Sequence, residues 1–317
     1  MMQQPLIIIS GATAVGKTDL SLSMAAAIGG EIISADSMQV YKGMDIGTAK
    51  ITRQEMKGIP HYLIDELDPG EEFNVYEFQK RCRTYIRDIT ARGKIPILTG
   101  GTGFYIQSVL YDIQFTDSET DLSYREELEK LAKTQGPGVL HKMLEEADPD
   151  AAQQIHENNI KRVIRALEYY RETGQPISAH NEEQRSRTSS FNYAYFVLNR
   201  ERSVIYDRIN LRVDQMMEQG LVEEVRSLLD QGVPPDALSM QGLGYKEIIR
   251  YLQGELTLPE AVSLIKQSTR HFAKRQLTWF RREKDVIWID YEDYPDPDAM
   301  LDHMINILKE KKIVPLS

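Results

Sequence analysis

The chain has 317 residues, of which 41% are hydrophobic and 27% charged, so it has enough apolar side chain for a sizeable core, and this composition excludes a disordered chain. Its one cysteine, Cys82, excludes a disulfide framework and a cysteine-based zinc site within one chain, and fits a reducing compartment. The N-terminal MMQQPLIIIS lacks the basic start and the apolar length of a secretion signal, and no later run is long enough to span a bilayer. We therefore expect a cytoplasmic protein that has no membrane partner.

Charge is unevenly distributed along the chain. The formal net charge is −10, which by itself argues against a nucleic-acid partner. The segment Lys266–Lys284, however, holds seven basic residues and one acid, so it carries +6 and the rest of the chain −16. Such a run is most often a solvated helix face, but on an acidic background it is also a candidate surface for an anionic partner.

Short apolar segments alternate with helical ones in the first hundred residues. Strands are expected at 6–10, 30–36, 61–65 and 94–101, and helices at 17–28 and 74–93. The apolar segments are short and bounded by glycines, as buried parallel strands are. This alternation predicts a parallel α/β sheet.

The pattern changes near residue 117. Amphipathic helical segments follow at 122–134, 137–146, 149–157 and 159–172, and then a polar, linker-like stretch at 178–190. Strand composition returns at 191–199, followed by helices at 202–219, 221–230, 245–253 and 259–283 and a last strand at 286–291. We therefore expect residues 1–116 to be the first part of a sheet core, 117–186 an all-helical insertion domain, and 187–317 the rest of the core with long C-terminal helices.

Residues 7–18, IIISGATAVGKT, match the phosphate-binding pattern G-x-x-x-x-G-K-[ST] after an expected strand and at the start of an expected helix. Glycines let the backbone curl so that several N–H groups point inward, the helix N-terminus adds positive potential, and a lysine adds a mobile charge. The core is therefore expected to be P-loop NTPase-like. The residues expected to hold phosphate are Gly11, Ala12, Thr13, Ala14, Val15, Gly16, Lys17 and Thr18, and the Thr18 hydroxyl is also expected to bind Mg²⁺.

The phosphate loop does not identify the molecule that carries the phosphates. A P-loop ATPase or small-molecule kinase is one interpretation, and YLIDE (62–66) supports it because apolar residues followed by an acid are typical of a Walker B strand. In the other interpretation the phosphates belong to a different substrate, which SADSMQVYKGMDIGTAK (34–50) favours. Asp36 follows the second strand and should face the phosphate loop across the edge of the sheet, while Ser37 and Gln39 can hydrogen-bond a base edge.

Both the Asp36 segment and a third loop have simpler interpretations. Asp36 in SADS is also typical of a residue that caps the next turn, and spacing alone does not separate the two roles. In ILTGGTGFY (97–105), Thr102 is flanked by glycines and so is accessible at the same edge, but an ordinary strand–helix turn would look alike.

Seven segments together resemble the tRNA dimethylallyltransferases, also called tRNA isopentenyltransferases, in their order and approximate spacing over about residues 6–290. They are GATAVGKT, SADSMQVYKGMDIGTAK, HYLID…DP…FNVYEF, ILTGGTGFYIQSVL, NIKRVIRALEYYRETGQPIS, LSMQGLGYKE and AKRQLTWFRRE. DSMQVYKGMDIGTAK is specific to this family and its adenylate-prenylating plant relatives. The runs after residue 155 resemble the bacterial, tRNA-modifying branch.

The resemblance implies both an activity and a set of site residues. The loop would hold the diphosphate of dimethylallyl diphosphate rather than ATP, and the prenyl group would go to N6 of the adenosine on the 3′ side of the anticodon, in tRNAs that read codons beginning with U. Asp36 would be the base, with Lys17 and Thr102 also catalytic. At Lys161 the chain departs from the family, where many relatives carry glutamine. The residues implied to contact tRNA are Asp36, Ser37, Met38, Gln39, Thr102, Arg125, Lys161, Arg162, Arg165, Gln241, Gly244, Tyr245, Lys246, Arg270, Lys274, Arg275 and Arg281.

The chemistry agrees with these residue types. An adenine amine is a poor nucleophile, but an allylic carbon tolerates cationic character as diphosphate leaves. The enzyme must then stabilise the departing charge, position N6 and accept its proton, which Lys17 with Mg²⁺ and Asp36 can do. The expected partners are dimethylallyl diphosphate and the anticodon stem-loop of tRNA, and the protein is expected to be a monomer. The alternatives are a P-loop ATPase or kinase and a nucleotide-switched RNA-binding protein without transfer chemistry.

Overall fold

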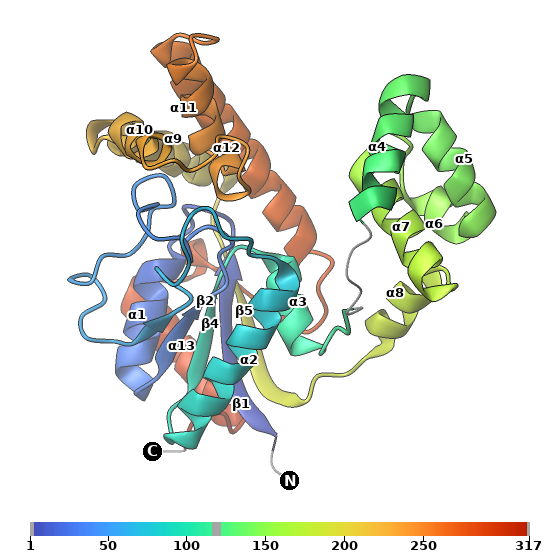
Figure 1. The fold of residues 1–317 in the computed structure, drawn as a ribbon. Coiled ribbons are helices and arrows are strands. Elements are labelled where there is room, and N and C mark those ends of the chain that lie inside the picture. Colours follow the sequence, from blue (N-terminus) through green and yellow to red (C-terminus); the bar gives the residue numbers. More distant parts are fainter. Residues whose placement is uncertain (1–2, 116–121, 316–317) are drawn as a thin grey trace. The chain divides into compact units, whose positions relative to one another are not determined.

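The computed structural model describes residues 3–115 and 122–315. The chain forms two compact units, one comprising Met1–Leu110 with Ser190–Ser317 and the other Tyr111–Ser189. We call them the core unit and the helical unit, and the helical unit is green to yellow-green in Figure 1. The expected boundary between residues 116 and 117 lies outside the described residues.

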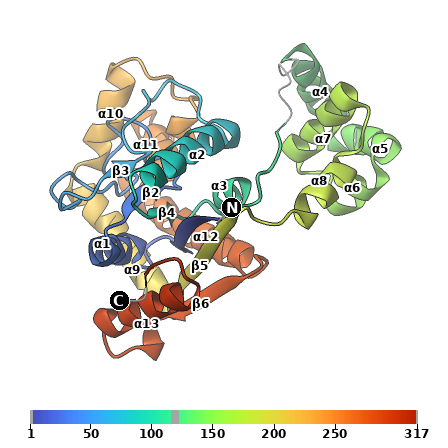
Figure 2. The ribbon, with the colours of Figure 1, turned by 90° about the horizontal axis from the view of Figure 1, so that it is seen from below.

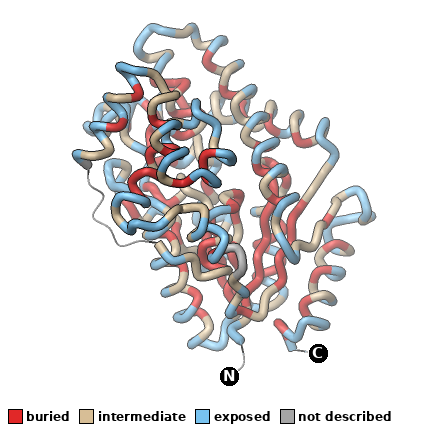
Figure 3. Tube along the Cα trace, turned by 90° about the vertical axis from the view of Figure 1, so that its right-hand side faces the viewer, coloured by how far each residue is buried: buried red, intermediate tan, exposed pale blue. Residues whose placement is uncertain are grey.

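The core unit is built on a six-stranded parallel sheet with the strand order β3-β2-β4-β1-β5-β6. In register, Ile7 of the central β1 lies beside Ile97 of β4 and Ala194 of β5. Parallel strands buried on both faces require nearly continuous apolar runs, and the strands are accordingly the most buried part of this unit (red in Figure 3). The expected parallel α/β sheet and each expected strand are confirmed. The strands are β1 (Gln4–Gly11), β2 (Glu31–Ser34), β3 (His61–Tyr62), β4 (Pro96–Gly100), β5 (Phe191–Asn199) and β6 (Val286–Asp290).

Helices cover both faces of the sheet, as Figure 2 shows along the strands. On one face lie α1 (Lys17–Ile28) and α13 (Pro297–Glu310), and on the other α2 (Val75–Ala91) and α3 (Gly103–Leu110). All six strands are parallel, so their carboxyl ends and the loops that follow them lie at one edge of the sheet.

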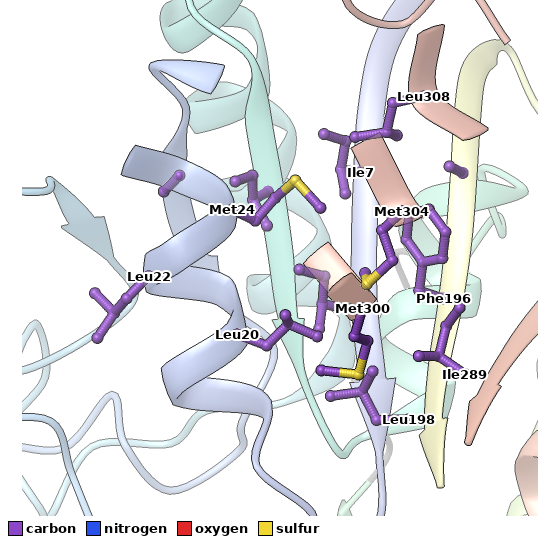
Figure 4. Close-up of a cluster of buried hydrophobic side chains, with 14 of the residues drawn as sticks. Ile7, Leu20, Leu22, Met24, Phe196, Leu198, Ile289, Met300, Met304 and Leu308 are labelled. Atoms are coloured by element: carbon purple, nitrogen blue, oxygen red, sulfur yellow. The ribbon is translucent and has the colours of Figure 1, made fainter. Parts of the chain in front are cut away.

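The core beneath α1 and α13 is rich in methionine. Met24, Met300 and Met304 pack with Ile7 and Phe196 in a single buried cluster (Figure 4). Flexible thioether side chains fill the irregular space between the two helices and the sheet.

Cys82 of α2 is fully buried, and burial raises the pKa of its thiol. A buried thiol held in its protonated form is a poor nucleophile. Cys82 is therefore a packing residue.

Four further helices complete the core unit: α9 (Arg202–Glu218), α10 (Leu221–Asp230), α11 (Tyr245–Leu252) and α12 (Leu258–Phe280), with short 3₁₀ turns at Ser239–Gln241 and Tyr291–Asp293. At the start of the long α12, the backbone N–H and the hydroxyl of Thr257 both donate to the Glu260 carboxylate, at 2.8 and 2.7 Å. Helices α3 and α13 were not expected from the sequence.

The helical unit contains α4 (Leu122–Gln135), α5 (Pro137–Ala147), α6 (Pro149–Gln154), α7 (Ile160–Thr173) and α8 (Ile177–Ser186). It has a hydrophobic cluster of its own, in which Leu128, Leu140, Leu144, Val163 and Leu167 are buried. An independent core is what allows a segment of this size to be compact by itself.

The expectation that residues 178–190 form a linker is wrong, because α8 occupies most of that segment. The buried Asp148 accepts hydrogen bonds from the backbone N–H and the hydroxyl of Ser178, at 2.9 and 2.7 Å. These bonds fix the first turn of α8 from a distant part of the chain, so a polar sequence with weak periodicity still forms a helix.

No helix in the described ranges is both long and apolar enough to cross a membrane.

Candidate active site

The phosphate loop connects β1 to α1 and has the strand–turn–helix geometry that the motif requires. Gly11 and Gly16 have positive φ angles of 141° and 113°, which are strained for other residues. Side chains at these two positions would also collide, because a Cβ would lie 2.5 Å from the Leu198 carbonyl oxygen and from the Tyr291 hydroxyl, respectively. The two glycines are therefore structural requirements of the loop.

The Lys17 ammonium lies inside this loop. Its Nζ donates hydrogen bonds to the carbonyl oxygens of Gly11 and Ala12, at 3.0 and 2.8 Å. Burial, reinforced by the positive charge of Arg212 and opposed by the carboxylate of Asp36, lowers the pKa of Lys17 to about 8. The carboxylate of Asp36 is therefore close enough to Lys17 to act on its charge.

Three arginines beside the loop were not predicted. Arg200 Nε donates to the Val15 carbonyl at 3.1 Å, and its guanidinium stacks on the Tyr291 ring at 3.4 Å. Arg208 of α9 donates to the Ala14 carbonyl at 2.7 Å. Arg212 lies one turn further along α9. Burial, followed by the nearby positive charge of Arg208, lowers the pKa of Arg212.

These arginines add positive charge where an anion would bind. No motif marks them in the sequence. The one available signal is that Arg208 and Arg212 are four residues apart in an expected helix and so share a face.

Asp36 has the turn-capping role that the sequence allowed, and it also lies at the carboxyl edge of the sheet. One oxygen, Oδ1, accepts the backbone N–H of Met38 at 2.8 Å and so shapes the turn after β2. The carboxylate is also near enough to raise the pKa of Tyr105, although burial of that phenol is the larger cause. Residues 36–39 are all half-buried, so a substrate can reach them.

Gln39 is held in a fixed orientation. Its Oε1 accepts a hydrogen bond from the Ser34 hydroxyl at 3.1 Å, and its Nε2 donates to the Thr48 carbonyl at 3.3 Å. The loop that contains Thr48 is anchored in turn by Glu224 of α10, whose carboxylate accepts the backbone N–H groups of residues 45–47 at 2.7 to 3.1 Å.

Tyr245 supports this loop from inside. Its hydroxyl donates to Glu224 at 2.6 Å, and its ring fills the space in which Gly47 has no side chain. Only 1% of Tyr245 is exposed, so its side chain is not at a surface that RNA could touch. Of the run 241–246, Gln241 is exposed and Lys246 half-exposed, whereas Gly244 is buried.

The segment YLIDE does not have the geometry of a Walker B strand. Strand β3 pairs only with β2 and lies at the edge of the sheet, with β2 and β4 between it and β1. Asp65 forms an ion pair at 2.5 Å with the buried Lys50, which also bonds Asp45 and the Tyr41 carbonyl. Asp65, which would be the Walker B acid of an ATPase, therefore forms an ion pair that stabilises the 41–50 loop.

Thr102 lies beside the Asp36 segment. Its backbone N–H donates to the carbonyl of Ala35 at 3.3 Å, and the neighbouring Gly100 packs so closely on Ala35 that a Cβ would overlap it. Helix α3 begins at the next residue, and the Thr102 carbonyl accepts from its first turn. The structure thus brings Lys17, Asp36 and Thr102 together at the carboxyl edge of β1, β2 and β4.

The basic residues of α12, and Arg281, which follows it, are not equally exposed. Lys274, Arg275 and Arg281 are exposed, but Arg270 is half-buried and its Nη1 donates to Asn210 at 2.7 Å. The exposed side of the helix contains a depression of about 420 Å³. Its lining residues are His271, Lys274, Arg275, Thr278, Trp279 and Arg282.

The remaining predicted residues belong to the helical unit. Arg125 forms a two-pronged ion pair with the buried Glu168, at 2.7 and 2.8 Å, which is a structural role whatever else it contacts. At the start of α7, Lys161 and Arg162 are exposed, and Arg165 is half-buried.

A phosphate-loop motif, a carboxylate and a threonine at one edge of a parallel sheet define an α/β protein of the P-loop class. Residues 39–283 match the family model described as IPP transferase. The chain belongs to this family.

The chain is 58% identical over 311 residues to a tRNA dimethylallyltransferase of Lachnoclostridium phytofermentans, covering 98% of this chain and 99% of that one. It is similar to the solved structure of the tRNA isopentenylpyrophosphate transferase of Bacillus halodurans, with a TM-score of 0.73, 44% identity and 98% of each chain covered. A structure of a eukaryotic dimethylallyltransferase acting on tRNA gives a TM-score of 0.81 at 31% identity, covering 98% of this chain and 80% of that one.

Proposed function

We propose that this protein is a tRNA dimethylallyltransferase, which transfers a dimethylallyl group from dimethylallyl diphosphate to N6 of the adenosine on the 3′ side of the anticodon, in tRNAs that read codons beginning with U. The observation that carries the proposal is the meeting of Lys17, Asp36 and Thr102 at one edge of the sheet. Membership of the IPP transferase family supports the same activity.

The phosphate loop binds the leaving group. The loop amides other than those of Thr13 and Val15, which bond Gln276 and the Ala12 carbonyl, face the diphosphate together with the Lys17 ammonium and the guanidinium of Arg212. These groups stabilise the negative charge that grows on the diphosphate as the bond from C1 to oxygen breaks. Lys17 must release its bonds to the Gly11 and Ala12 carbonyls, which two phosphate oxygens can replace.

The adenine binds on the Asp36 side. The N6 lone pair forms the new bond to C1, and the free oxygen of the Asp36 carboxylate accepts the proton that N6 loses. Ser37, Met38 and Gln39 contact the base, and the oriented amide of Gln39 can both donate to and accept from its edge. Thr102 adds a hydroxyl on the same side. An adenosine from an anticodon loop has to leave its stack to reach this position.

Mg²⁺ fits this site in the way it usually binds to phosphates. The described residues contain no group of three or more His, Cys, Asp or Glu side chains that could hold a metal alone. Mg²⁺ commonly needs only one or two protein oxygens when phosphates and water supply the rest, and the exposed Thr18 hydroxyl at the start of α1 is such a ligand. When bound, the ion neutralises charge on the departing diphosphate.

The tRNA is bound by exposed basic residues. Lys274 and Arg275 of α12, Arg281 directly after it, Gln241 and Lys246 contact the phosphate backbone. Lys161, Arg162 and Arg165 of the helical unit contact the same molecule. We place the protein in the cytoplasm, where it acts as a monomer.

The test uses an anticodon stem-loop with three consecutive adenosines and radiolabelled dimethylallyl diphosphate. We expect transfer of label to the RNA, and protection against thermal unfolding by dimethylallyl diphosphate but not by ATP. Hydrolysis of ATP without transfer of label would instead favour an ATPase, and the proposal would be withdrawn.

A further inference from the structure

Gln276 is a buried polar residue on the otherwise basic helix α12. Only 6% of it is exposed, whereas its neighbours Lys274 and Arg275 are at the surface. A buried amide needs hydrogen-bond partners, since burying it unpaired destabilises the fold. The partners of Gln276 are therefore informative.

The two ends of the Gln276 amide reach two different loops. Its Oε1 accepts the backbone N–H of Thr13 in the phosphate loop at 2.9 Å. Its Nε2 donates to the carbonyl of Gly101 at 2.9 Å, in the loop that follows β4. The fit at Gly101 is tight, because a Cβ there would overlap Nε2.

These two bonds complete a connection across the site. Gly101 precedes Thr102, whose N–H bonds the carbonyl of Ala35, the residue before Asp36. The connection therefore runs from the diphosphate loop through Gln276 to the loop of the general base. Only a side chain that donates at one end and accepts at the other can bridge an N–H group and a carbonyl in this way.

We propose that Gln276 is a positioning residue that sets the distance between the phosphate loop and the loops that carry Thr102 and Asp36. This inference rests on the proposed function, because the distance matters only if a leaving group on one side must be aligned with a base on the other. Misplacing reacting groups by about 1 Å can reduce the rate by about 10²-fold.

The first test is Gln276→Met, which keeps the size of the side chain but removes both hydrogen bonds. The matched control is Gln267→Met, the same substitution at an exposed position of the same helix. We expect Gln276→Met to slow single-turnover transfer by about 10- to 10²-fold and to raise the Kd for inorganic diphosphate several-fold, with the Kd for tRNA unchanged. Transfer and diphosphate binding equal to those of the control would overturn the inference.

The second test is Gln276→Glu, which gives a pH signature that a purely structural role does not. The carboxylate can accept the Thr13 N–H but repels the Gly101 carbonyl. Its protonated form can donate to that carbonyl and so restores both bonds. Burial favours the protonated form, so the rate of Gln276→Glu relative to wild type should rise as the pH falls from 8 to 6.

If the rate of Gln276→Glu relative to wild type does not change with pH, the two-bond connection is contradicted. The Gln276→Glu experiment decides the question if Gln276→Met does not fold. If the wild type itself transfers no label, the proposed function fails, while the comparison of diphosphate binding still tests Gln276.

Discussion

In the proposed mechanism the two oxygens of Asp36 have separate roles, and asparagine can perform only one of them. In Asp36→Asn the amide oxygen can still accept the Met38 N–H, so the turn after β2 is preserved. The basicity is lost, and removal of a general base typically slows a reaction by about 10² to 10⁴. We expect a loss of this size in single-turnover prenylation with both substrates saturating, and little change in the Kd for dimethylallyl diphosphate. A rate within about threefold of wild type would leave Asp36 as a positioning residue only.

Lys17 gives the site a dependence on pH. Because its pKa is lowered to about 8, the ammonium is present below that pH and is lost as the pH rises through it. The affinity for dimethylallyl diphosphate should therefore fall between pH 7 and pH 9, which the ligand-induced shift in Tm measures at each pH.

Lys17→Arg is the control for this experiment, since a guanidinium stays charged over the whole range. Its shift in Tm, even if smaller, should be nearly independent of pH. Parallel pH curves for the two proteins would assign the effect to another group.

At the scale of elements, the buried and exposed sides of α12 carry different residues. Its buried side bonds the site loops through Gln276, and its exposed side carries Lys274 and Arg275. Arg270, although in line with these residues along the helix, is held by Asn210 and is a weaker candidate for an RNA contact.

The double variant Lys274→Glu with Arg275→Glu should weaken tRNA binding and flatten its dependence on salt. Each phosphate contact that is lost reduces the slope of log K against log[salt] by about 0.7 to 0.9. Titrations at several salt concentrations measure this slope. Lys311→Glu with Lys312→Glu makes the same change in net charge near the start of β5, at the opposite end of the sheet, and should leave the slope unaltered. Equal slopes in both double variants would mean that α12 does not bind phosphates.

The helices that were missed show what a single sequence hides. Helix α3 is apolar on nearly every side because it is buried, so it lacks the polar face that marks an amphipathic helix. Helix α8 depends on a cap supplied by Asp148, thirty residues away. Helix α13, by contrast, has ordinary signals, with Asp296 as its N-cap and a proline in its first turn, and could have been predicted.

Part of the candidate site could be predicted from the sequence, and part could not. The phosphate loop, which includes Lys17, and Asp36 each follow an expected strand. Parallel strands bring their carboxyl ends to one edge of the sheet, so the closeness of Lys17 and Asp36 was predictable. Arg200, Arg208 and Gln276 form one or two hydrogen bonds to backbone groups far away in sequence. Such contacts depend on the docking of whole helices, which no local pattern encodes.

At the scale of the whole molecule, the chain has two hydrophobic cores, and we expect them to respond separately. Leu144→Ala removes a fully buried side chain from the helical unit, a change that typically costs about 2–5 kcal/mol. Calorimetry should show a lower Tm for the helical unit, while the Kd for inorganic diphosphate stays as in wild type. Lys142→Ala, exposed on the same helix, is the control. A parallel loss of diphosphate affinity would mean that the two units fold as one.

Because Cys82 is buried, cysteines introduced at the surface can be labelled selectively. Because the protein's one thiol is enclosed by α2 and the sheet and is held protonated, maleimide dyes have no natural target on the folded chain. Cysteines introduced at the exposed positions Ser263 of α12 and Lys133 of α4 would then be the reactive ones. A dye pair at these positions would report by energy transfer how the distance between the core unit and the helical unit changes when tRNA is added.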